Sequence, residues 1–281
     1  MKKQIAFLLA AFLVGLFATA QAHATGALGA TALRTQGTTQ AAGTVPMTLQ
    51  SHENGRRIDG EVFAVLDVPF TTAGPALAEP SSWCEIVLLH LNTKSCRRIS
   101  DSQGTVIEAR VGKKEPQPPE DASLLSFRWK PATKRADYVS VQMMADTGPY
   151  DTHDCLLYAE AVPLEDGRTF LHMGYAFSAG DMGVIASKLY LATVGRNKIG
   201  FTREGDKYIG GTRAIAERNT MRYYLGVDAY LASLSLPPQQ QAEARMTRWF
   251  DSTEKYARQL HEIDRDAYLA MKREELKRPQ R

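Results

Sequence analysis

The sequence lacks the motifs that carry the commonest transferable reaction mechanisms. It contains no GxSxG nucleophile elbow, no phosphate-binding loop, no dinucleotide fingerprint and no HExxH pair. Its three cysteines form no CxxC pair and follow no zinc-ligand spacing. We therefore expect no cofactor and no metal, and the motifs identify no catalytic residue.

A strong charge of one sign is also missing. The net charge is +3, and it falls to +1 if Lys2 and Lys3 are removed with an N-terminal signal. Such a weak field would not attract a polyanion, so we expect no nucleic-acid partner.

Long hydrophobic runs are scarce after the first 24 residues. Residues 1–24 contain two lysines, an apolar run from Ile5 to Phe17 and a small-residue end, Ala22-His23-Ala24, which are the three parts of a secretory signal. The run has about 13 residues, whereas a membrane-spanning helix needs ~20. We expect a Sec-type signal cleaved after Ala24 rather than a permanent anchor, no stable membrane span, and a periplasmic or secreted protein.

The region from Thr25 to Thr48 is rich in Ala, Gly, Thr and Gln. With almost no large apolar groups it is typical of a flexible leader, which we predict for residues 25–48. The folded body then begins with a strand at 61–70 and a largely buried helix at 80–91.

From about residue 105 to 177 the hydrophobic period is two. Alternating apolar and polar residues, separated by short turns, predict an antiparallel meander. Its strands are expected near 106–111, 124–129, 139–145, 155–162 and 169–177.

The last hundred residues change to helical periodicity. Helices are predicted at 181–191, at 212–234, and at 242–263 after the break at Pro237-Pro238, with a final amphipathic stretch at 268–278.

Cysteine pairing follows from the expected compartment. Cys84 and Cys96 are the favoured pair, because closing their 12-residue separation removes denatured-state entropy equivalent to ~3 kcal/mol. Cys155 would remain a thiol. The alternative is that all three are buried apolar fillers.

The order of elements resembles that of the START-like or helix-grip superfamily, which includes polyketide cyclases and birch-pollen-allergen-type proteins. One strand, a helical excursion through Trp83, antiparallel strands and a long helix cover roughly Glu61 to Leu234. The resemblance implies an α+β fold in which a curved antiparallel sheet grips a long helix around a cavity for an apolar ligand. We assign residues 49–236 to this domain and 237–281 to an added helical extension.

Four segments also look like those of an exported bacterial family that has no assigned activity. They are Trp83-Cys84, residues 91–96, residues 195–201 and residues 217–224. This resemblance supplies no catalytic residue.

The most unusual polar group lies in the long helix. Arg213 and Glu217 are four residues apart and can pair, while Arg218 and Arg222 place two guanidinium groups on one side. These side chains could hold a carboxylate or phosphate head group. A solvated helix face or a structural ion pair is the alternative, and the same two interpretations apply to Arg196 and Lys198.

His172 lies on a predicted strand and points away from its neighbours Leu171 and Met173. On the concave face it could bind a ligand or act as a base, and otherwise it faces solvent. Tyr175, with other aromatic residues, could line an apolar pocket or belong to the core.

The function expected is non-catalytic binding or transport of a hydrophobic, lipid-like small molecule in the periplasm. A cyclase-like or hydrolase-like enzyme that uses the same cavity is one alternative. The other is an envelope interaction or scaffold protein, which would show a broad apolar patch on the helices from 242 to 278.

Overall fold

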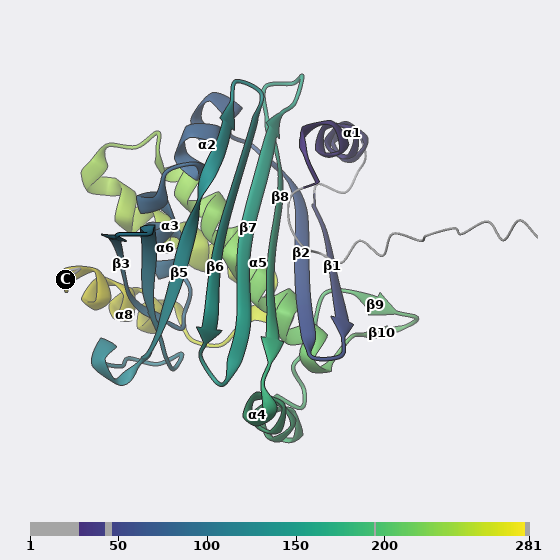
Figure 1. Cartoon of the computed structure of the whole chain (residues 1–281), viewed down its shortest axis with the longest axis vertical. Coiled ribbons are helices and arrows are strands. Elements are labelled where there is room, and N and C mark those ends of the chain that lie inside the picture. The colour runs from purple at the N-terminus through teal and green to yellow at the C-terminus, as the bar shows by residue number, and fades with distance from the viewer. Residues whose placement is uncertain (1–27, 43–46, 194, 279–281) are drawn as a thin grey trace, which may run out of the picture.

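A computed structural model describes residues 28–42, 47–193 and 195–278. Its centre is an eight-stranded antiparallel sheet in the order β1-β2-β8-β7-β6-β5-β4-β3 (Figure 1). The strands are β1 (Met47–Asn54), β2 (Arg57–Leu66), β3 (Thr93–Asp101), β4 (Gly104–Val111), β5 (Ser123–Arg135), β6 (Tyr138–Gly148), β7 (Thr152–Pro163) and β8 (Thr169–Ala179).

The alternation along each strand decides which face of the sheet each side chain occupies. In β8, Leu171 and Met173 join a core that includes Val227 of the long helix, whereas Phe170 joins a smaller core on the other side. The meander predicted from the period of two is confirmed, because β4 to β8 pair in sequence order.

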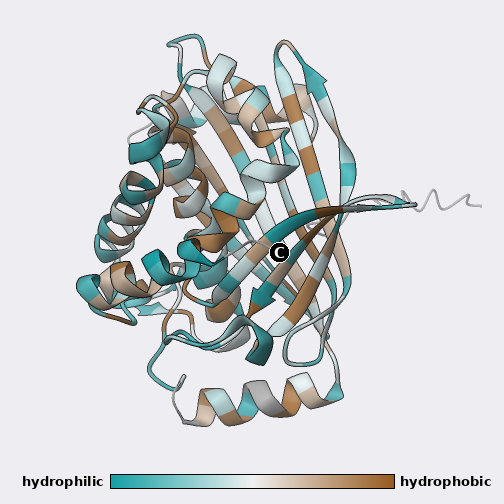
Figure 2. Cartoon of the chain, turned by 90° about the vertical axis from the view of Figure 1, so that its left-hand side faces the viewer, coloured by the Kyte–Doolittle hydropathy of each residue, from teal (hydrophilic) through white to brown (hydrophobic). Residues whose placement is uncertain are grey.

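A long helix, α5 (Gly211–Ser233), packs on the concave side of the sheet against β1, β2 and β8. The approach is close, since a Cβ atom at Gly60 would lie 2.5 Å from Oγ1 of Thr220. Two short helices, α2 (Phe70–Leu77) and α3 (Pro80–Leu88), contact α5 in the same layer. Figure 2 shows helices gathered on one side of the sheet. The expected α+β fold, with a curved antiparallel sheet gripping a long helix, is confirmed.

The C-terminal helices cover the other side of α5. They are α6 (Pro238–Glu254), α7 (Ala257–Leu260) and α8 (Arg265–Lys277). Trp249 stacks on Tyr268 with 4.9 Å between ring centroids, and its indole N–H donates to the carbonyl of Arg222 at 3.0 Å. Helix α5 is therefore buried between the sheet and the added helices.

The predicted disulfide between Cys84 and Cys96 is present and joins α3 to β3. Cys155 is a buried free thiol, and burial raises its pKa. The bond fastens the short helical layer to the far edge of the sheet.

The structure differs from the flexible leader predicted for residues 25–48. Residues 30–41 form helix α1 (Ala30–Ala41), and strand β1 begins at Met47. Leu33 of α1 is fully buried against Phe63 and Phe170 on the convex face of the sheet. Composition alone misses this helix because a single large apolar residue packs into a surface that distant strands create. The predicted signal, residues 1–24, lies outside the described residues.

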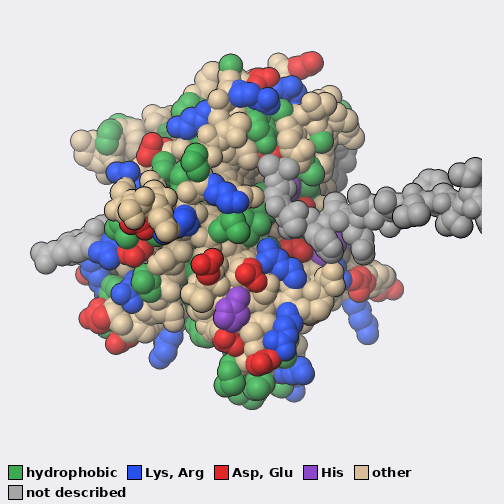
Figure 3. All heavy atoms as spheres, in the orientation of Figure 1, with side chains coloured by type: hydrophobic (Ala, Val, Ile, Leu, Met, Phe, Trp, Pro, Cys, Tyr) green, Lys and Arg blue, Asp and Glu red, His purple; other side chains and the backbone are tan. Residues whose placement is uncertain are grey.

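Helix α4 (Asp181–Ala192) follows the last strand of the sheet and stands apart from the main body at the bottom of Figure 1. Met182, Ile185 and Leu189 expose 65%, 58% and 66% of their surface along one side of it. The hydrophobic side chains gathered there are visible at the lower edge of Figure 3. Among the described helices, none has the length and apolar character needed to cross a membrane.

Two small elements complete the secondary structure. A two-stranded ribbon, β9 (Arg203–Glu204) and β10 (Lys207–Tyr208), lies between α4 and α5. A single 3₁₀ turn, Pro119–Asp121, precedes β5. Both lie in loops that the periodicity of the sequence leaves unassigned.

Candidate functional site

Four cationic side chains meet around one carboxylate beside α5. Lys114, Lys198 and Arg222 lie 2.7, 2.9 and 3.1 Å from the carboxylate oxygens of Glu262, and Arg218 also pairs with it. We call these five residues the cation cluster. The two arginines come from neighbouring turns of α5, while the lysines come from the loops that follow β4 and α4.

Electrostatics in the cation cluster are dominated by burial and by mutual repulsion. Burial alone would raise the pKa of Glu262, but Lys114, Arg222 and Lys198 lower it to about 2. Burial, together with the charge of Arg218, lowers the pKa of Arg222 to about 10. Burial also lowers the pKa of Lys114 to about 8, although Glu262 opposes the shift. In all, four cationic side chains surround the single carboxylate of Glu262.

His90 lies next to this cluster, in the turn after α3. His90 is buried, and its pKa lies well below 6.5. Burial is the largest cause of this shift, and the charges of Arg222 and Lys272 add to it. The backbone N–H of Asn92 donates to Nδ1 at 3.2 Å, so a neutral ring carries its proton on Nε2. Within the described residues that Nε2 atom makes no hydrogen bond of normal geometry, although the side chain of Asn219 is close enough to interact with the ring and oppose the fall in its pKa.

Aromatic side chains continue from His90 along the concave face. The ring of Tyr223 lies 5.1 Å from His90 and 5.5 Å from Tyr175, and Phe177 lies 5.6 Å beyond Tyr175. Tyr175, Phe177 and Tyr223 all remain partly accessible. Burial nevertheless raises the pKa values of Tyr175 and Tyr223. Both phenols thus stay neutral in an apolar setting.

The structure brings together some of the cations predicted from the sequence and separates others. Arg218, Arg222 and Lys198 converge on Glu262. Arg196 lies on the same loop as Lys198, but its side chain is exposed to solvent. Arg196 therefore fits the solvated alternative, whereas Arg218, Arg222 and Lys198 form the structural ion pair that the same alternative allowed.

Glu217 does not pair with Arg213. Arg213 contacts Glu204 and the hydroxyl of Ser51. Glu217 is fully buried and accepts hydrogen bonds from Ser51, from the backbone N–H groups of Phe201 and Thr202, and from the hydroxyl of Thr202. The predicted pair is wrong because Glu217 instead holds the loop after α4 against α5.

His172 occupies the opposite, convex face of the sheet and is buried there. Its ring stacks on Phe63 with centroids 4.2 Å apart, and its Nδ1 lies 2.8 Å from Glu160. Its Nε2 lies 3.5 Å from Glu61 and 3.3 Å from the hydroxyl of Tyr158. A ligand held between the sheet and α5 would not touch His172.

The two glutamates beside His172 also accept hydrogen bonds from tyrosine hydroxyls. Tyr138 donates to Glu160 at 2.8 Å, and Tyr158 donates to Glu61 at 2.9 Å. We call these five residues the outer cluster. Burial by itself would lower the pKa of His172, but hydrogen bonds to the two glutamates outweigh it and raise that pKa.

Backbone groups complete the outer cluster. The N–H groups of Leu28 and Gly29, which lead into α1, donate to the carboxylate of Glu160. Glu160 therefore accepts from a histidine, a tyrosine and two backbone groups, and it has no free lone pair directed at a ligand.

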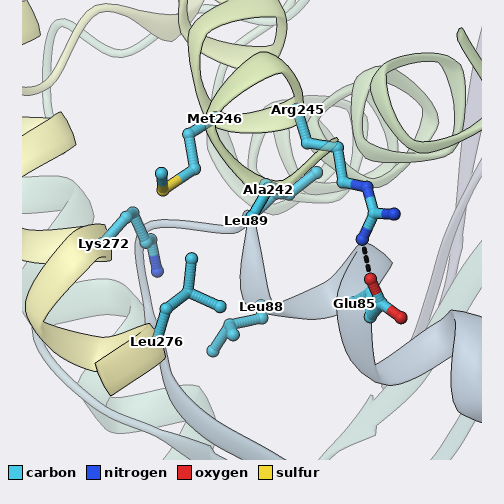
Figure 4. Close-up of a pocket in the computed structure, with 8 residues that line it drawn as sticks. All are labelled: Glu85, Leu88, Leu89, Ala242, Arg245, Met246, Lys272 and Leu276. Atoms are coloured by element: carbon cyan, nitrogen blue, oxygen red, sulfur yellow. Dashed lines mark ion pairs between the residues drawn. The ribbon is translucent and has the colours of Figure 1, made fainter. Parts of the chain in front are cut away.

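A small apolar pocket lies between α3, α6 and α8 (Figure 4). The ion pair between Arg245 and Glu85 lies at its edge. Lys272 also reaches it, but its ammonium group donates to Glu275 and to two backbone carbonyls. These polar groups are already satisfied, so the pocket offers no group for chemistry. Its apolar lining consists of Leu88, Leu89, Ala242, Met246 and Leu276.

Sequence patterns do not identify Lys114, Glu262 or His90 as site residues. Lys114 lies in a proline-rich loop, Glu262 precedes α8 and His90 follows α3, so no local motif links the three. Only the packing of their loops against α5 brings them together.

Among the described residues, no group of His, Cys, Asp or Glu side chains is arranged to hold a metal ion. The cations of the cation cluster suit an anion instead.

Comparisons with known proteins find distant structural likenesses. No protein-family model and no curated protein matches the chain. Similar solved structures include Ara h 8.0201, with 9% identity over 66% of this chain and 99% of that one and a TM-score of 0.36. Human StAR-related lipid transfer protein 5 has 11% identity over 58% and 88% of the two chains, with a TM-score of 0.32.

A norcoclaurine synthase from Thalictrum has 9% identity over 51% of this chain and 82% of that one, with a TM-score of 0.33. At TM-scores of 0.32 to 0.36 these likenesses carry no argument about this chain. The arrangement of a curved antiparallel sheet around α5 rests on the strand order and contacts of the chain itself.

Proposed function

We propose that this protein binds a hydrophobic, lipid-like small molecule between the concave face of its sheet and α5, without catalysing a reaction. The observation that carries the proposal is the row of rings formed by Tyr175, Phe177 and Tyr223. These rings remain partly accessible on the face that α5 covers. An apolar ligand placed against them would lose contact with water, which favours binding.

A neutral fluorescent probe, N-phenyl-1-naphthylamine, tests this proposal. Wild-type protein should bind it saturably, and Tyr223→Ala should weaken binding about 10-fold because a contacting ring is lost. Tyr150→Ala is the matched control, since Tyr150 is 67% exposed. Circular dichroism would establish that both variants fold. Equal affinity in all three proteins would contradict the proposed location.

Native mass spectrometry with solvent extraction gives an independent test. An apolar molecule that copurifies with the wild-type protein would support carriage. A protein that binds no probe and carries no extractable molecule would contradict it.

We also propose that the protein acts in the periplasm or outside the cell. The signal-like pattern of residues 1–24 and the disulfide between Cys84 and Cys96 support this location, since disulfides persist in oxidising compartments. The intact mass of protein from a periplasmic extract would test it. A chain that begins at Thr25 is the expected result, and retention of residues 1–24 would contradict it.

The enzyme alternative gains no support from the outer cluster. His172 and Glu160 are buried on the convex face, so they lie away from any ligand beneath α5. The sequence contains none of the common catalytic motifs, and the hydrogen bonds of the outer cluster are satisfied within the protein. Both observations favour a structural role for His172 and Glu160.

The interaction alternative has one specific observation in its favour. Three exposed apolar side chains lie together on α4, whereas within the described residues 242–278, where a patch was expected, Leu276 is the one large apolar side chain that is exposed. If that alternative holds, native mass spectrometry should show a bound envelope polypeptide, and replacing Met182, Ile185 and Leu189 by serine should remove it.

A further inference from the structure

We infer that the ligand carries an oxyanion head group, a carboxylate or a phosphate, and that Lys114, Lys198, Arg222 and His90 bind it. This inference rests on the proposed function and specifies the ligand class. The head group would lie at the cation cluster, while the apolar part would lie against Tyr223 and Tyr175.

The charge balance of the cation cluster favours an added anion. Every ion pair that its two lysines and two arginines make within the described residues ends on Glu262. Four cations therefore share one carboxylate that is itself almost buried. Like charges at such short range repel one another, and an added anion would relieve that repulsion.

Two buried donors at the cluster are poorly satisfied. The Nε atom of Arg222 has no hydrogen-bond partner in the described part of the chain, and the Nε2 atom of His90 makes no hydrogen bond of normal geometry there, with only the side chain of Asn219 near it. Both carry a hydrogen, because an arginine is always protonated and Asn92 donates to the other ring nitrogen of His90. A buried donor without a good acceptor is unfavourable, and an oxyanion would accept from both.

The cluster is also continuous with the aromatic row. Arg222 and Tyr223 are adjacent in α5, and the ring of His90 lies 5.1 Å from the ring of Tyr223. One amphipathic molecule could therefore contact the cations at one end and the rings at the other.

Accessibility makes Lys114 and Lys198 the best positions for a test. Their side chains are 34% and 28% exposed, whereas those of Arg218 and Arg222 are 3% and 2% exposed. Replacing a lysine should leave the fold intact. Lys113 is the matched control for Lys114, because it is the adjacent residue, is 70% exposed and pairs with Glu115.

The experiment compares laurate, 1-dodecanol and inorganic phosphate as competitors of the naphthylamine probe, with phosphate also titrated directly by calorimetry. Laurate should bind wild-type protein at least about 10-fold more tightly than dodecanol, because hydrogen bonds between charged groups are strong. Lys114→Met and Lys198→Met should remove most of that preference, and Lys113→Met should keep it.

The outcomes separate this inference from the proposed function. Equal binding of laurate and dodecanol to wild-type protein would overturn the inference and leave the proposed function standing. If no apolar molecule binds but phosphate binds and Lys114→Met abolishes it, the proposed function fails while the oxyanion site survives as a site for free phosphate. If neither laurate nor phosphate binds, the oxyanion site is overturned.

Discussion

The outer cluster and the cation cluster both bury ionisable side chains, but they differ in how completely their hydrogen bonds are satisfied. In the outer cluster, His172 lies between two glutamates and each carboxylate also accepts from a tyrosine hydroxyl. In the cation cluster, four cations share Glu262, and a guanidinium nitrogen has no partner within the described residues. The outer cluster therefore completes a core, whereas the unsatisfied groups of the cation cluster agree with the proposal that it binds an anion.

Their positions agree with this distinction. The outer cluster is covered by the segment that leads into α1, whose backbone donates to Glu160. The cation cluster lies among loops, and both of its lysines reach solvent. An anion can therefore approach the cation cluster from solvent, whereas the outer cluster is closed.

Removing His172 gives the largest expected effect. His172→Leu leaves Glu160 and Glu61 buried without their shared cation, so the free energy of unfolding should fall by about 3–5 kcal/mol. Chemical denaturation measures the change. His153→Leu is the control, because His153 is partly exposed and pairs with Asp151, and it should change stability by less than about 1 kcal/mol. If His172→Leu lowered the free energy of unfolding by as little as His153→Leu, the outer cluster would not be stabilising the core.

Glu262→Gln tests the cation cluster. Four cations would then face one another without a carboxylate, and stability should fall by about 3 kcal/mol. Added phosphate should restore more of the melting temperature in this variant than in the wild-type protein. Glu243→Gln, which removes an exposed ion pair with Arg273, is the control. A phosphate response equal to that of the wild-type protein would count against anion binding at the cluster.

The outer cluster also predicts a pH dependence. Folding raises the pKa of His172, so its contribution is fully present below about pH 6.5 and is lost as the pH rises through the folded value. Each tenfold gain in the proton affinity of His172 on folding contributes about 1.4 kcal/mol to stability. Folding lowers the pKa values of Glu160 and Glu61 despite their burial, so their contributions are lost as the pH falls below about 4.5.

Denaturation at several pH values checks this expectation through the difference in stability between wild-type protein and His172→Leu. That difference should be largest below about pH 6.5 and should fall as the pH rises through the raised pKa of His172, where the histidine loses its proton. A difference that is constant with pH would show that His172 does not gain proton affinity on folding.

Tyr138→Phe is the smallest perturbation of the outer cluster. It removes one hydrogen bond to Glu160, which keeps its other donors, and should lower stability by about 1 kcal/mol. Tyr150→Phe provides the exposed control. Thermal melts of the two variants should differ by a few degrees, and identical melts would mean that the Tyr138 hydroxyl contributes nothing.

Local patterns predict most of the elements because they depend on short repeats. The period of two locates β4 to β8, and helical periodicity locates α3, α4 and α5. The patterns miss α1, β1, α2 and β3, and the strand predicted at 61–70 is β2, which ends at Leu66. Helix α1 depends on Leu33 packing against strands from elsewhere, and β1 and β3 are the edge strands of the sheet, where alternation is weak.

The candidate site is only partly predictable. The spacing of Arg218 and Arg222 places both side chains on one side of the helix, and both contact Glu262. The same spacing suggests that Arg213 pairs with Glu217, yet tertiary neighbours supply better partners for both. A helical repeat shows which side chains share a face but not what that face meets.

Residues close together in the chain specify most of the order of strands and helices, favour the cysteine pair and set the two faces of the meander strands. The placement of His172 on the convex face, and the meeting of Lys114, His90 and Glu262 with Arg222, arise only in the folded molecule. Those contacts depend on how the sheet curves and where α5 crosses it. No repeat of two or about 3.6 residues contains that information.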